Sequence, residues 1–283
     1  MSKWRPVPQN CLYVIPDIHG ANDLLQKILD RILPLRKSDG VKDQIIFLGD
    51  YIDRHIDSPK VLDTCIDLKK KYGSQVTFLL GNHELMLLRA MDALPGRKLT
   101  MQDLSSSYEM WRKNGGFETL AGYLQRAGVT ESNLLDFPRN RVIDYVPAEH
   151  IKFMQEGLVK CHETDSYIFV HGGMDPTESA YKQDLESLVW DRALCKSVIT
   201  AINRGYPLEW EKTIVTGHNV QNSRLPVISD KFMMLDCGSP KQLLVVELNS
   251  MEAFMAAPDK KRLVKYKLDP TEATRGFLRR VDP

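Results

Sequence analysis

The chain has 283 residues, which is enough to bury a sizeable core in one domain or two. Its 38 lysine and arginine residues nearly balance 37 aspartate and glutamate residues, so charge does not favour nucleic acid or an anionic membrane as a partner. No apolar run could span a bilayer, and residues 1–10 lack the apolar core of a signal peptide. We therefore expect a cytoplasmic protein with no membrane partner.

The first hundred residues alternate between short apolar runs and helical patterns. The runs 12–15, 44–48 and 76–80 are flanked by polar residues or glycine, which is typical of strands buried on both faces. Residues 23–36 carry leucine and isoleucine at helical spacing, and Ser58-Pro59 predicts the N-cap and first turn of another helix. This β-α-β-α-β order predicts parallel strands, and ligands collect at the carboxyl ends of such strands.

Residues 85–160 have a mostly helical pattern, interrupted at Gly115-Gly116, and Pro147 is placed to start another helix. We interpret this stretch as an insertion or cap, because it is too short and strand-poor to form a domain. Strand-like runs return at 167–170, 213–216, 232–235 and 242–248. The tail from 257 to 283 is mildly basic, and we expect a solvated packing segment there.

The five cysteines are odd in number and scattered, with no Cys-x-x-Cys pair. They are Cys11, Cys65, Cys161, Cys195 and Cys237. Several lie in apolar surroundings, which suits reduced thiols in a core better than disulfides or zinc fingers.

Five strand-like runs end in polar clusters, each beside a glycine. The clusters read PDIHG (16–20), GDYIDRH (49–55), GNHE (81–84), HGG (171–173) and GH (217–218). One such end could arise by chance, but five in the same context predict that one rim of the fold gathers these side chains.

Six of these side chains offer oxygen or nitrogen donors that suit Mn²⁺, iron or Zn²⁺, and none is a thiolate. They are Asp17, His19, Asp50, Asn82, His171 and His218. One metal ion rarely takes six protein ligands and stays catalytic, whereas two ions that share a carboxylate would use all six and keep open positions. Counting ligands therefore favours a dinuclear site.

The histidines outside these clusters serve as a comparison. A lone histidine is more often a core or surface residue than a ligand, and His150 and His162 lie in the helical stretch and at its exit. We expect structural roles for both. His55 directly follows Arg54, and its role stays open.

Two arginines and one glutamate near the clusters need separate weighing. An arginine offers a planar fork that matches phosphate oxygens, so we favour Arg54 as a phosphate clamp. For Arg192, a clamp and a surface ion pair stay equally open. Glu84 could act as a base, but an acid in the first turn of a helix favours the helix dipole, so we prefer a structural role.

The ordered clusters resemble the GDxHG, GDxxDRG, GNHE, HGG/HAG and GH motifs of the phosphoprotein phosphatase branch of the calcineurin-like metallophosphoesterases. The set spans Asp17 to His218, and LDCG at 235–238 is similar to the family's later strand. The MLL, W, NGG and TL pattern after GNHE is similar to bacterial and phage members, including the bacteriophage lambda phosphatase type.

This resemblance implies an α/β fold in which a central β-sandwich is flanked by helices in α-β-β-α layers. It implies one metallophosphoesterase domain over 1–283, with 85–160 as a helical insertion. It also assigns the metal ligands. Asp17, His19 and Asp50 would hold one ion, and Asp50, Asn82, His171 and His218 the other.

The resemblance further implies a mechanism. A hydroxide bridging two divalent ions would attack phosphorus in line, and His83, oriented by Asp53, would protonate the leaving oxygen. Arg54 and Arg192 would bind the substrate phosphate. Manganese is the expected metal, with iron and zinc as alternatives.

Two residues depart from the family motifs. Pro16 replaces the glycine before Asp17, and His55 replaces the glycine after Arg54. Proline removes a backbone donor and fixes φ, and the histidine adds a titratable ring near the phosphate site. Neither change removes a ligand, so both bear on substrate preference.

Several functions are compatible with these motifs. A serine/threonine protein phosphatase leads, with a symmetrical dinucleoside (diadenosine) tetraphosphatase as the alternative, although that group should carry aspartate in place of Glu84. A metal-dependent phosphodiesterase or nuclease would need a basic groove, and a phosphopeptide-binding module without activity would not need clustered carboxylates. The expected partner is a phosphorylated protein or a nucleotide, not a nucleic acid, and the oligomeric state is left open.

Overall fold

The computed structural model describes residues 10–38, 41–96, 98–130, 134–269 and 278–280. The strands are β1 (Leu12–Ile15), β2 (Lys37–Ser38), β3 (Val41–Lys42), β4 (Gln44–Phe47), β5 (Val76–Leu79), β6 (Leu158–Val159), β7 (Cys161–Glu163), β8 (Tyr167–Val170), β9 (Thr213–Thr216), β10 (Val227–Ile228), β11 (Phe232–Met234), β12 (Leu243–Glu247), β13 (Glu252–Ala256), β14 (Val264–Leu268) and β15 (Leu278–Arg280). The α-helices are α1 (Asn22–Ile32), α2 (Ser58–Tyr72), α3 (Asn82–Ala90), α4 (Met101–Trp111), α5 (Phe117–Arg126), α6 (Ala148–Lys152), α7 (Leu185–Trp190) and α8 (Ala193–Arg204).

Two sheets form the centre of the molecule. The larger sheet has the strand order β15-β14-β13-β12-β1-β4-β5-β6, and the smaller one has the order β10-β11-β9-β8-β7. Strands β1, β4 and β5 are parallel neighbours, as the β-α-β-α-β pattern predicts, and β8, β9 and β11 are parallel in the smaller sheet. The carboxyl ends of both parallel sets therefore face one rim.

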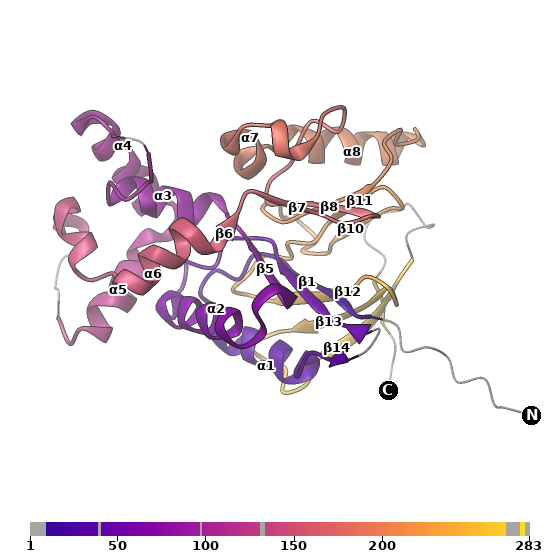
Figure 1. Cartoon of the computed structure of the whole chain (residues 1–283), viewed down its shortest axis with the longest axis horizontal. Coiled ribbons are helices and arrows are strands. Elements are labelled where there is room, and N and C mark those ends of the chain that lie inside the picture. The colour runs from indigo at the N-terminus through magenta and orange to yellow at the C-terminus, as the bar shows by residue number, and fades with distance from the viewer. Residues whose placement is uncertain (1–9, 39–40, 97, 131–133, 270–277, 281–283) are drawn as a thin grey trace, which may run out of the picture.

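The sheets pack face to face, and helices cover their outer faces. Figure 1 shows α7 and α8 over the smaller sheet and α1 and α2 under the larger one, with α3 to α6 to one side. Strand β4 explains the layers, because Ile45 and Phe47 join the core under the helices while Ile46 joins the core between the sheets. The predicted α-β-β-α sandwich is confirmed.

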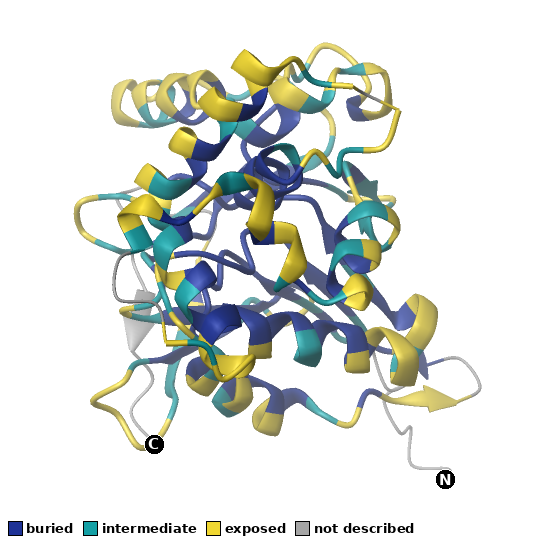
Figure 2. Ribbon diagram, turned by 90° about the vertical axis from the view of Figure 1, so that its left-hand side faces the viewer, coloured by how far each residue is buried: buried dark blue, intermediate teal, exposed yellow. Residues whose placement is uncertain are grey.

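Apolar burial follows these layers closely. Figure 2 shows dark blue strands in the interior and yellow positions on the outer faces of the helices. Cys65, Cys161, Cys195 and Cys237 are buried and all five cysteines are free, as expected for reduced thiols. Among the described residues, no helix combines the length and apolar composition that a membrane span requires.

The helix predicted over 23–36 is shorter than expected. It ends at Ile32, and Leu33 is extended with φ −94° and ψ 155°. The residue before a proline avoids the helical region, and Pro34 follows. The second helix begins near its predicted start, with Asp57 rather than Ser58 as the flanking residue.

The stretch after β5 is largely helical, as its pattern predicts. Helices α4 and α5 are joined by a π-helical turn, Arg112–Gly116, and α6 begins directly after Pro147. The end of this stretch differs from the prediction, because Leu158–Val159 forms β6 and pairs with β5 in the larger sheet. Two residues are too few for a strand pattern to be recognised in a sequence.

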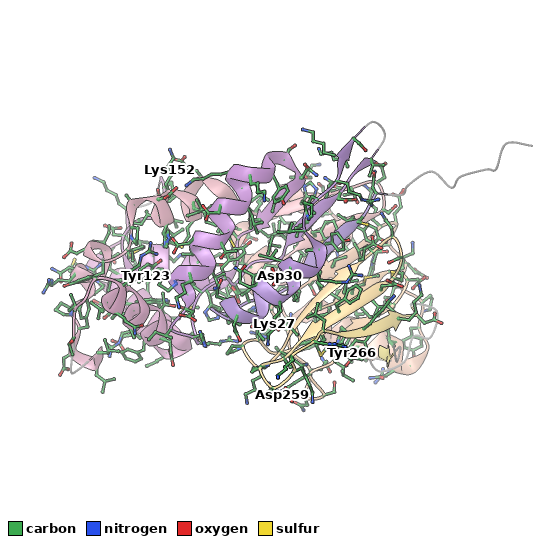
Figure 3. All side chains as sticks on the ribbon, turned by 90° about the horizontal axis from the view of Figure 1, so that it is seen from below. Lys27, Asp30, Tyr123, Lys152, Asp259 and Tyr266 are labelled. Carbon is green, nitrogen blue, oxygen red and sulfur yellow. The ribbon has the colours of Figure 1, made fainter. Side chains whose placement is uncertain are left out.

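The described part of the tail after residue 257 packs on the domain while much of it stays solvent-exposed, and it contains a strand that the sequence pattern did not predict. Strand β14 pairs with β13 in the larger sheet, and Leu268 is buried between the sheets. The Lys27 ammonium on α1 donates to the carbonyls of Ala257 and Lys260, so the helix and this segment lie side by side (Figure 3). The alternation in VKYKL indicates a strand, but the lysine content obscured it. Residues 270–277 and 281–283 of the tail lie outside the described residues.

Candidate metal centre

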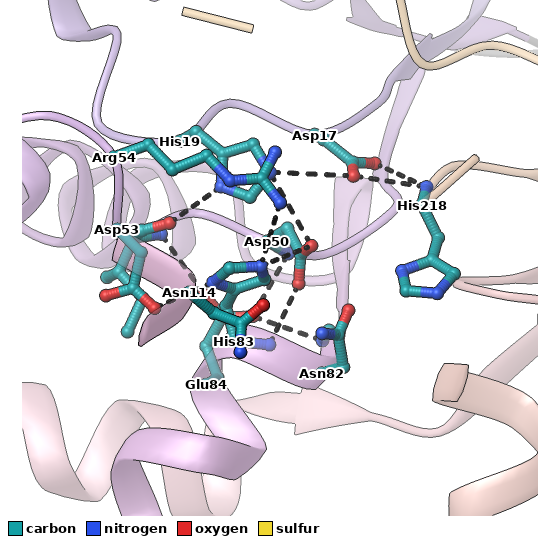
Figure 4. A network of polar contacts seen from close by, with 12 residues as sticks. Asp17, His19, Asp50, Asp53, Arg54, Asn82, His83, Glu84, Asn114 and His218 are labelled. Carbon is teal, nitrogen blue, oxygen red and sulfur yellow. Dashed lines mark hydrogen bonds and ion pairs between the residues drawn. The ribbon is translucent and has the colours of Figure 1, made fainter. Parts of the chain in front are cut away.

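Five segments bring the six predicted metal ligands to one rim. Asp17 and His19 follow β1, Asp50 follows β4, Asn82 follows β5, His171 follows β8 and His218 follows β9. Each of these six residues is at most 7% exposed. Figure 4 shows most of them pointing toward one another. Both sheets therefore contribute donors to a single buried cluster.

The carboxylate of Asp50 lies at the centre of this cluster. Its Oδ2 is 3.7 Å from Nε2 of His19 and 3.7 Å from Nε2 of His83. Its Oδ1 is 3.3 Å from Nε2 of His171. The donor atoms of His19, Asp50 and His83, and likewise those of Asp50, His171 and His218, lie within 4.8 Å of one another. Because Asp50 belongs to both donor groups, its carboxylate could coordinate two cations at once.

Asp17 and Asn82 complete the cluster on either side. The backbone N–H of His218 donates to Asp17 Oδ1 at 2.9 Å, and Asp17 Oδ2 is 3.9 Å from Nε2 of His19. Asn82 Oδ1 is 2.9 Å from Nε2 of His171. These contacts place an oxygen donor beside each group of imidazoles.

The imidazole rings are oriented with Nε2 toward the cluster. Nδ1 of His19 lies 2.9 Å from the carbonyl of Ile52, and Nδ1 of His171 lies 2.8 Å from the carbonyl of Leu48. These carbonyls accept from a protonated Nδ1, which directs Nε2 of each ring into the cluster. Nε2 of His19 and Nε2 of His218 are buried with no hydrogen-bond partner among the described residues. Such atoms are rare in native proteins and suit metal coordination.

Strained backbone holds several of these residues. The angle φ is +47° at His19, +54° at Asp50, +72° at Asp53, +66° at Arg54 and +60° at His218. Non-glycine residues rarely adopt this left-handed region, and such strain is concentrated at functional sites.

The backbone at Gly81 of GNHE and at Gly217 of GH lies close against a predicted carboxylate ligand, and only glycine leaves room for this. A Cβ on Gly81 would overlap Asp50 Oδ1, and a Cβ on Gly217 would overlap Asp17 Oδ1. Any larger residue at either position would displace a predicted ligand.

Glu84 has a structural role, as preferred, but through tertiary contacts rather than the helix dipole alone. Its carboxylate accepts from the backbone N–H groups of Asp50, Tyr51 and Ile52 at 3.0, 2.8 and 3.2 Å, and from that of Gly81 at 3.1 Å. Burial and the nearby Asp50 raise the pKa of Glu84 to about 7. This one side chain thus ties the loop after β4 to the start of α3.

His83 and Asp53 form a buried pair at the edge of the cluster. His83 Nδ1 lies 2.7 Å from Asp53 Oδ2. The other oxygen, Oδ1, accepts from Trp111 Nε1 at 3.0 Å and from Thr119 Oγ1 at 2.7 Å. The backbone N–H of Asp53 donates to Ser58 Oγ and Thr119 Oγ1 at 3.0 and 2.8 Å.

Sequence reasoning missed Trp111 and Thr119 as residues of this site. Both belong to the pattern W, NGG and TL, which drew attention only by its resemblance to phage and bacterial phosphatases. The contact could not be read from spacing, because 58 and 66 residues separate these side chains from Asp53.

The two arginines occupy different sides of the rim. Nη2 of Arg54 is 3.2 Å from Nε2 of His83, and its backbone N–H donates to the Gly115 carbonyl at 2.9 Å. Nη1 of Arg192 donates to Asn219 Oδ1 at 2.9 Å, one residue beyond His218. Nη1 of Arg192 also lies 3.5 Å from the carbonyl of His218, so this guanidinium lies beside a predicted ligand.

The two departures from the motifs have separate surroundings. Nδ1 of His55 accepts from the backbone N–H of Asp57 at 3.1 Å, so this ring supports the turn before α2. Pro16 is buried directly after β1. Both departures leave the donor set complete.

His150 and His162 lie apart from the cluster, as expected. His150 is 1% exposed, with Nδ1 2.9 Å from Tyr123 Oη and Nε2 2.8 Å from Asp63 Oδ1. His162 stacks on Phe169 with ring centroids 6.1 Å apart. Both predictions of a structural role are confirmed.

The pKa values of the two aspartates Asp17 and Asp50 are shifted in opposite directions by burial and by neighbouring charges. Burial, strengthened by the negative Asp236, raises the pKa of Asp17 well above its usual range. Burial also opposes the ionisation of Asp50, but the adjacent His171 and His83 hold its pKa well below its usual range. Asp236, from the LDCG segment, is 1% exposed, and burial raises its pKa too. Three carboxylates buried this close together are more stable in the charged form when a cation lies among them.

Burial and the same neighbouring charges also shift the pKa values of the histidines. Burial lowers the pKa of His171, but Asp50 overrides it and raises the value to about 9. Burial lowers the pKa of His218 to about 3, and His171 adds to this effect. Burial also acts against a charged His83, but Asp50 and Asp53 raise its pKa. A histidine that stays neutral, such as His218, can coordinate a cation without first losing a proton.

The donor set fits divalent cations. Carboxylate, imidazole and amide donors converge, and two buried Nε2 atoms have no other described partner.

The chain is similar to known hydrolases. It is 41% identical over 76 residues to the symmetrical bis(5'-nucleosyl)-tetraphosphatase of Actinobacillus succinogenes, which is 27% of this chain and 25% of that protein. The same enzyme of Dechloromonas aromatica is 30% identical over 168 residues, 59% of this chain and 45% of that protein. The serine/threonine-protein phosphatase SIT4 of Candida albicans is 40% identical over 84 residues, 29% of this chain and 26% of that protein.

These matches cover from a quarter to less than half of the curated relatives, as the 25% and 45% shares show. The model of the calcineurin-like phosphoesterase family matches residues 12–223, which contain every predicted ligand and both arginines. The chain therefore belongs to the calcineurin-like phosphoesterase family.

Proposed function

We propose that this protein is a dinuclear-metal phosphatase that hydrolyses phosphate monoesters of serine and threonine in proteins. The observation that carries the proposal is the contact of Arg54 with His83, in which Nη2 lies 3.2 Å from Nε2 beside the Asp50 carboxylate. Arg54 would bind the terminal phosphate, and His83 beside it would protonate the leaving oxygen.

Two divalent ions are assigned to the six donors. Asp17, His19 and Asp50 would hold the first, and Asp50 with Asn82, His171 and His218 the second. Manganese is the proposed metal, and iron and zinc suit the same donors. When bound, such ions lower the pKa of water and neutralise charge on phosphoryl oxygens.

His83 is proposed as the general acid rather than a ligand. Its Nδ1 is committed to Asp53, which leaves Nε2 facing the substrate side. Burial and the Arg54 guanidinium oppose a charged ring, but the Asp50 and Asp53 carboxylates outweigh them and raise the pKa of His83, which favours the protonated form that an acid requires. Asp53 holds the ring orientation and does not itself exchange the proton.

Arg54 and Arg192 are proposed to bind phosphate from opposite sides. The Arg54 guanidinium already lies beside His83, and the Arg192 guanidinium donates to Asn219 next to His218, so both groups stand at the site. Guanidinium groups pair with phosphate through two parallel hydrogen bonds.

The test is hydrolysis of p-nitrophenyl phosphate and a phosphoserine peptide by protein loaded with Mn²⁺. We expect turnover that chelation abolishes and Mn²⁺ restores. His83→Asn should retain metal and lose at least about a hundredfold in kcat, with the larger loss on the phosphoserine peptide, whose alkoxide leaving group needs the proton more. Metal-loaded protein that cleaves neither substrate would overturn the proposal.

A symmetrical dinucleoside tetraphosphatase is the second candidate. It is favoured by the similarity to the Dechloromonas aromatica enzyme, which extends over 59% of this chain. Measuring kcat/KM for diadenosine tetraphosphate beside the phosphopeptide distinguishes the two candidate functions. A kcat/KM at least tenfold higher for this substrate than for any phosphopeptide would replace the first proposal with the second.

A further inference from the structure

A cavity of about 970 Å³ opens beside the metal centre. Its wall comes from the loop after β8, from α7 and α8, and from the segment before β9. The apolar lining residues are Met174, Trp190, Leu194, Val198, Leu208 and Trp210. The Trp210 Nε1 donates to the Lys231 carbonyl at 2.8 Å, so this ring is fixed in the wall. A cavity of this size and lining is typical of a binding site.

The cavity adjoins the rim that carries the predicted ligands, through two of its lining residues, Trp190 and Arg192. The Trp190 ring meets the His218 ring edge to face, with centroids 6.1 Å apart. Arg192 lines the cavity and also donates to Asn219, next to His218. A group attached to a phosphate at the centre would therefore lie next to the cavity.

The charged lining residues are mostly acidic. Asp175, Glu186 and Asp191 line the cavity, against the single guanidinium of Arg192. Glu186 also pairs with Arg89 on α3. With Glu186 paired to Arg89, Asp175 and Asp191 face the guanidinium of Arg192, and this surplus of one carboxylate favours cationic groups over additional phosphates.

We propose that this cavity binds an apolar side chain of the phosphoprotein substrate, close in sequence to the phosphorylated residue and accompanied by a basic residue. The inference rests on the proposed function and names its substrate class. The apolar wall would remove an aliphatic or aromatic side chain from water, which stabilises the complex. The acidic residues at its lip complement lysine or arginine in the substrate.

The charge distribution distinguishes this occupant from a nucleotide. The remaining phosphates of a dinucleoside polyphosphate would pass Asp175, Glu186 and Asp191 on the way to the cavity. A peptide with arginine and leucine carries the opposite charge at the same place.

The experiment is a panel of phosphoserine peptides assayed for kcat/KM with Mn²⁺-loaded protein. One leucine is placed one, two or three residues before or after the phosphoserine, with arginine or glutamate beside it and an all-alanine peptide as reference. We expect the best leucine-arginine peptide to exceed the alanine peptide by about tenfold, the effect of burying one aliphatic side chain. Glu186→Gln should lower the preference for arginine over glutamate.

The matched variants are Ala201→Phe and Thr200→Phe. Ala201 lines the cavity, whereas Thr200 is exposed on the same helix and is not among the residues that line it. Ala201→Phe should erase the preference for leucine and leave turnover of p-nitrophenyl phosphate unchanged, because that substrate has no group to enter the cavity. Thr200→Phe should change neither.

The outcomes separate the two proposals. Phosphopeptide turnover with no leucine preference, or a preference that survives Ala201→Phe, overturns this inference and leaves the proposed function standing. No phosphopeptide turnover overturns the proposed function itself. If Ala201→Phe instead impairs only diadenosine tetraphosphate hydrolysis, the cavity serves a nucleoside and the inference is wrong.

Discussion

The indole Nε1 of Trp111 donates to Asp53 Oδ1 at 3.0 Å, across 58 residues of chain. Thr119 Oγ1 donates to the same oxygen at 2.7 Å, and the second oxygen contacts His83. The helical stretch after GNHE therefore fixes the carboxylate that orients the proposed acid.

Thr119→Val should lower kcat about tenfold with little change in KM. The variant removes a hydroxyl that accepts from the Asp53 backbone N–H and donates to its carboxylate, so the His83 ring would lose orientation while the phosphate clamps remain. Steady-state kinetics on p-nitrophenyl phosphate and a phosphoserine peptide, with metal content measured in parallel, check this. Thr119→Ser keeps the hydroxyl and should retain kcat, and an equal loss in both variants would contradict the prediction.

Adding Mn²⁺ should raise the melting temperature, and Asp50→Asn should remove that increase. Ligand binding to the folded state contributes about 2.7 kcal/mol at a concentration about one hundred times Kd. Asp50 faces both imidazole groups, so its loss affects both ions. Asp30→Asn on α1, at an exposed position, is the control. Thermal unfolding with and without EDTA gives the result, and an undiminished increase in Asp50→Asn would contradict the assignment.

Glu84→Asp should destabilise the protein by about 1–3 kcal/mol, the cost of leaving buried donors unpaired. The side chain is one methylene shorter and cannot reach the amides of Asp50, Tyr51 and Ile52 together. Urea unfolding with EDTA present measures the loss independently of metal. Glu209→Asp, at an exposed position before β9, should unfold as the parent does. A variant as stable as the parent would mean that these hydrogen bonds contribute little.

His150→Gln should make stability less dependent on pH between 7.5 and 5. Burial lowers the pKa of His150 below its unfolded value of 6.5, although Asp63 opposes this. The folded state thus favours the neutral ring, so the stabilisation is complete above 6.5 and is lost as pH falls toward the lower folded pKa. The difference between the two proteins in free energy of unfolding at pH 7.5 and pH 5 isolates this group. Parallel pH curves for the two proteins would contradict the assignment.

The sequence by itself predicted the central strands and grouped the candidate metal donors. Runs such as LYVI and QIIF are short, largely apolar and flanked by polar residues or glycine, which favours buried strands, and parallel order places Asp17 and Asp50 at neighbouring strand ends. Five motifs in a fixed order then identified the family, and its model matches residues 12–223.

Tertiary structure alone decided which distant residues support and flank that site. The hydrogen bonds of Trp111 and Thr119 to Asp53 depend on how α4 and α5 pack, which local periodicity does not encode. The cavity beside Trp190 and Trp210 likewise forms only when α7, α8 and the segment before β9 come together. Local pattern is set by neighbours along the chain, whereas these contacts are set by the packing of separate elements in space, where each side chain is buried only by the others.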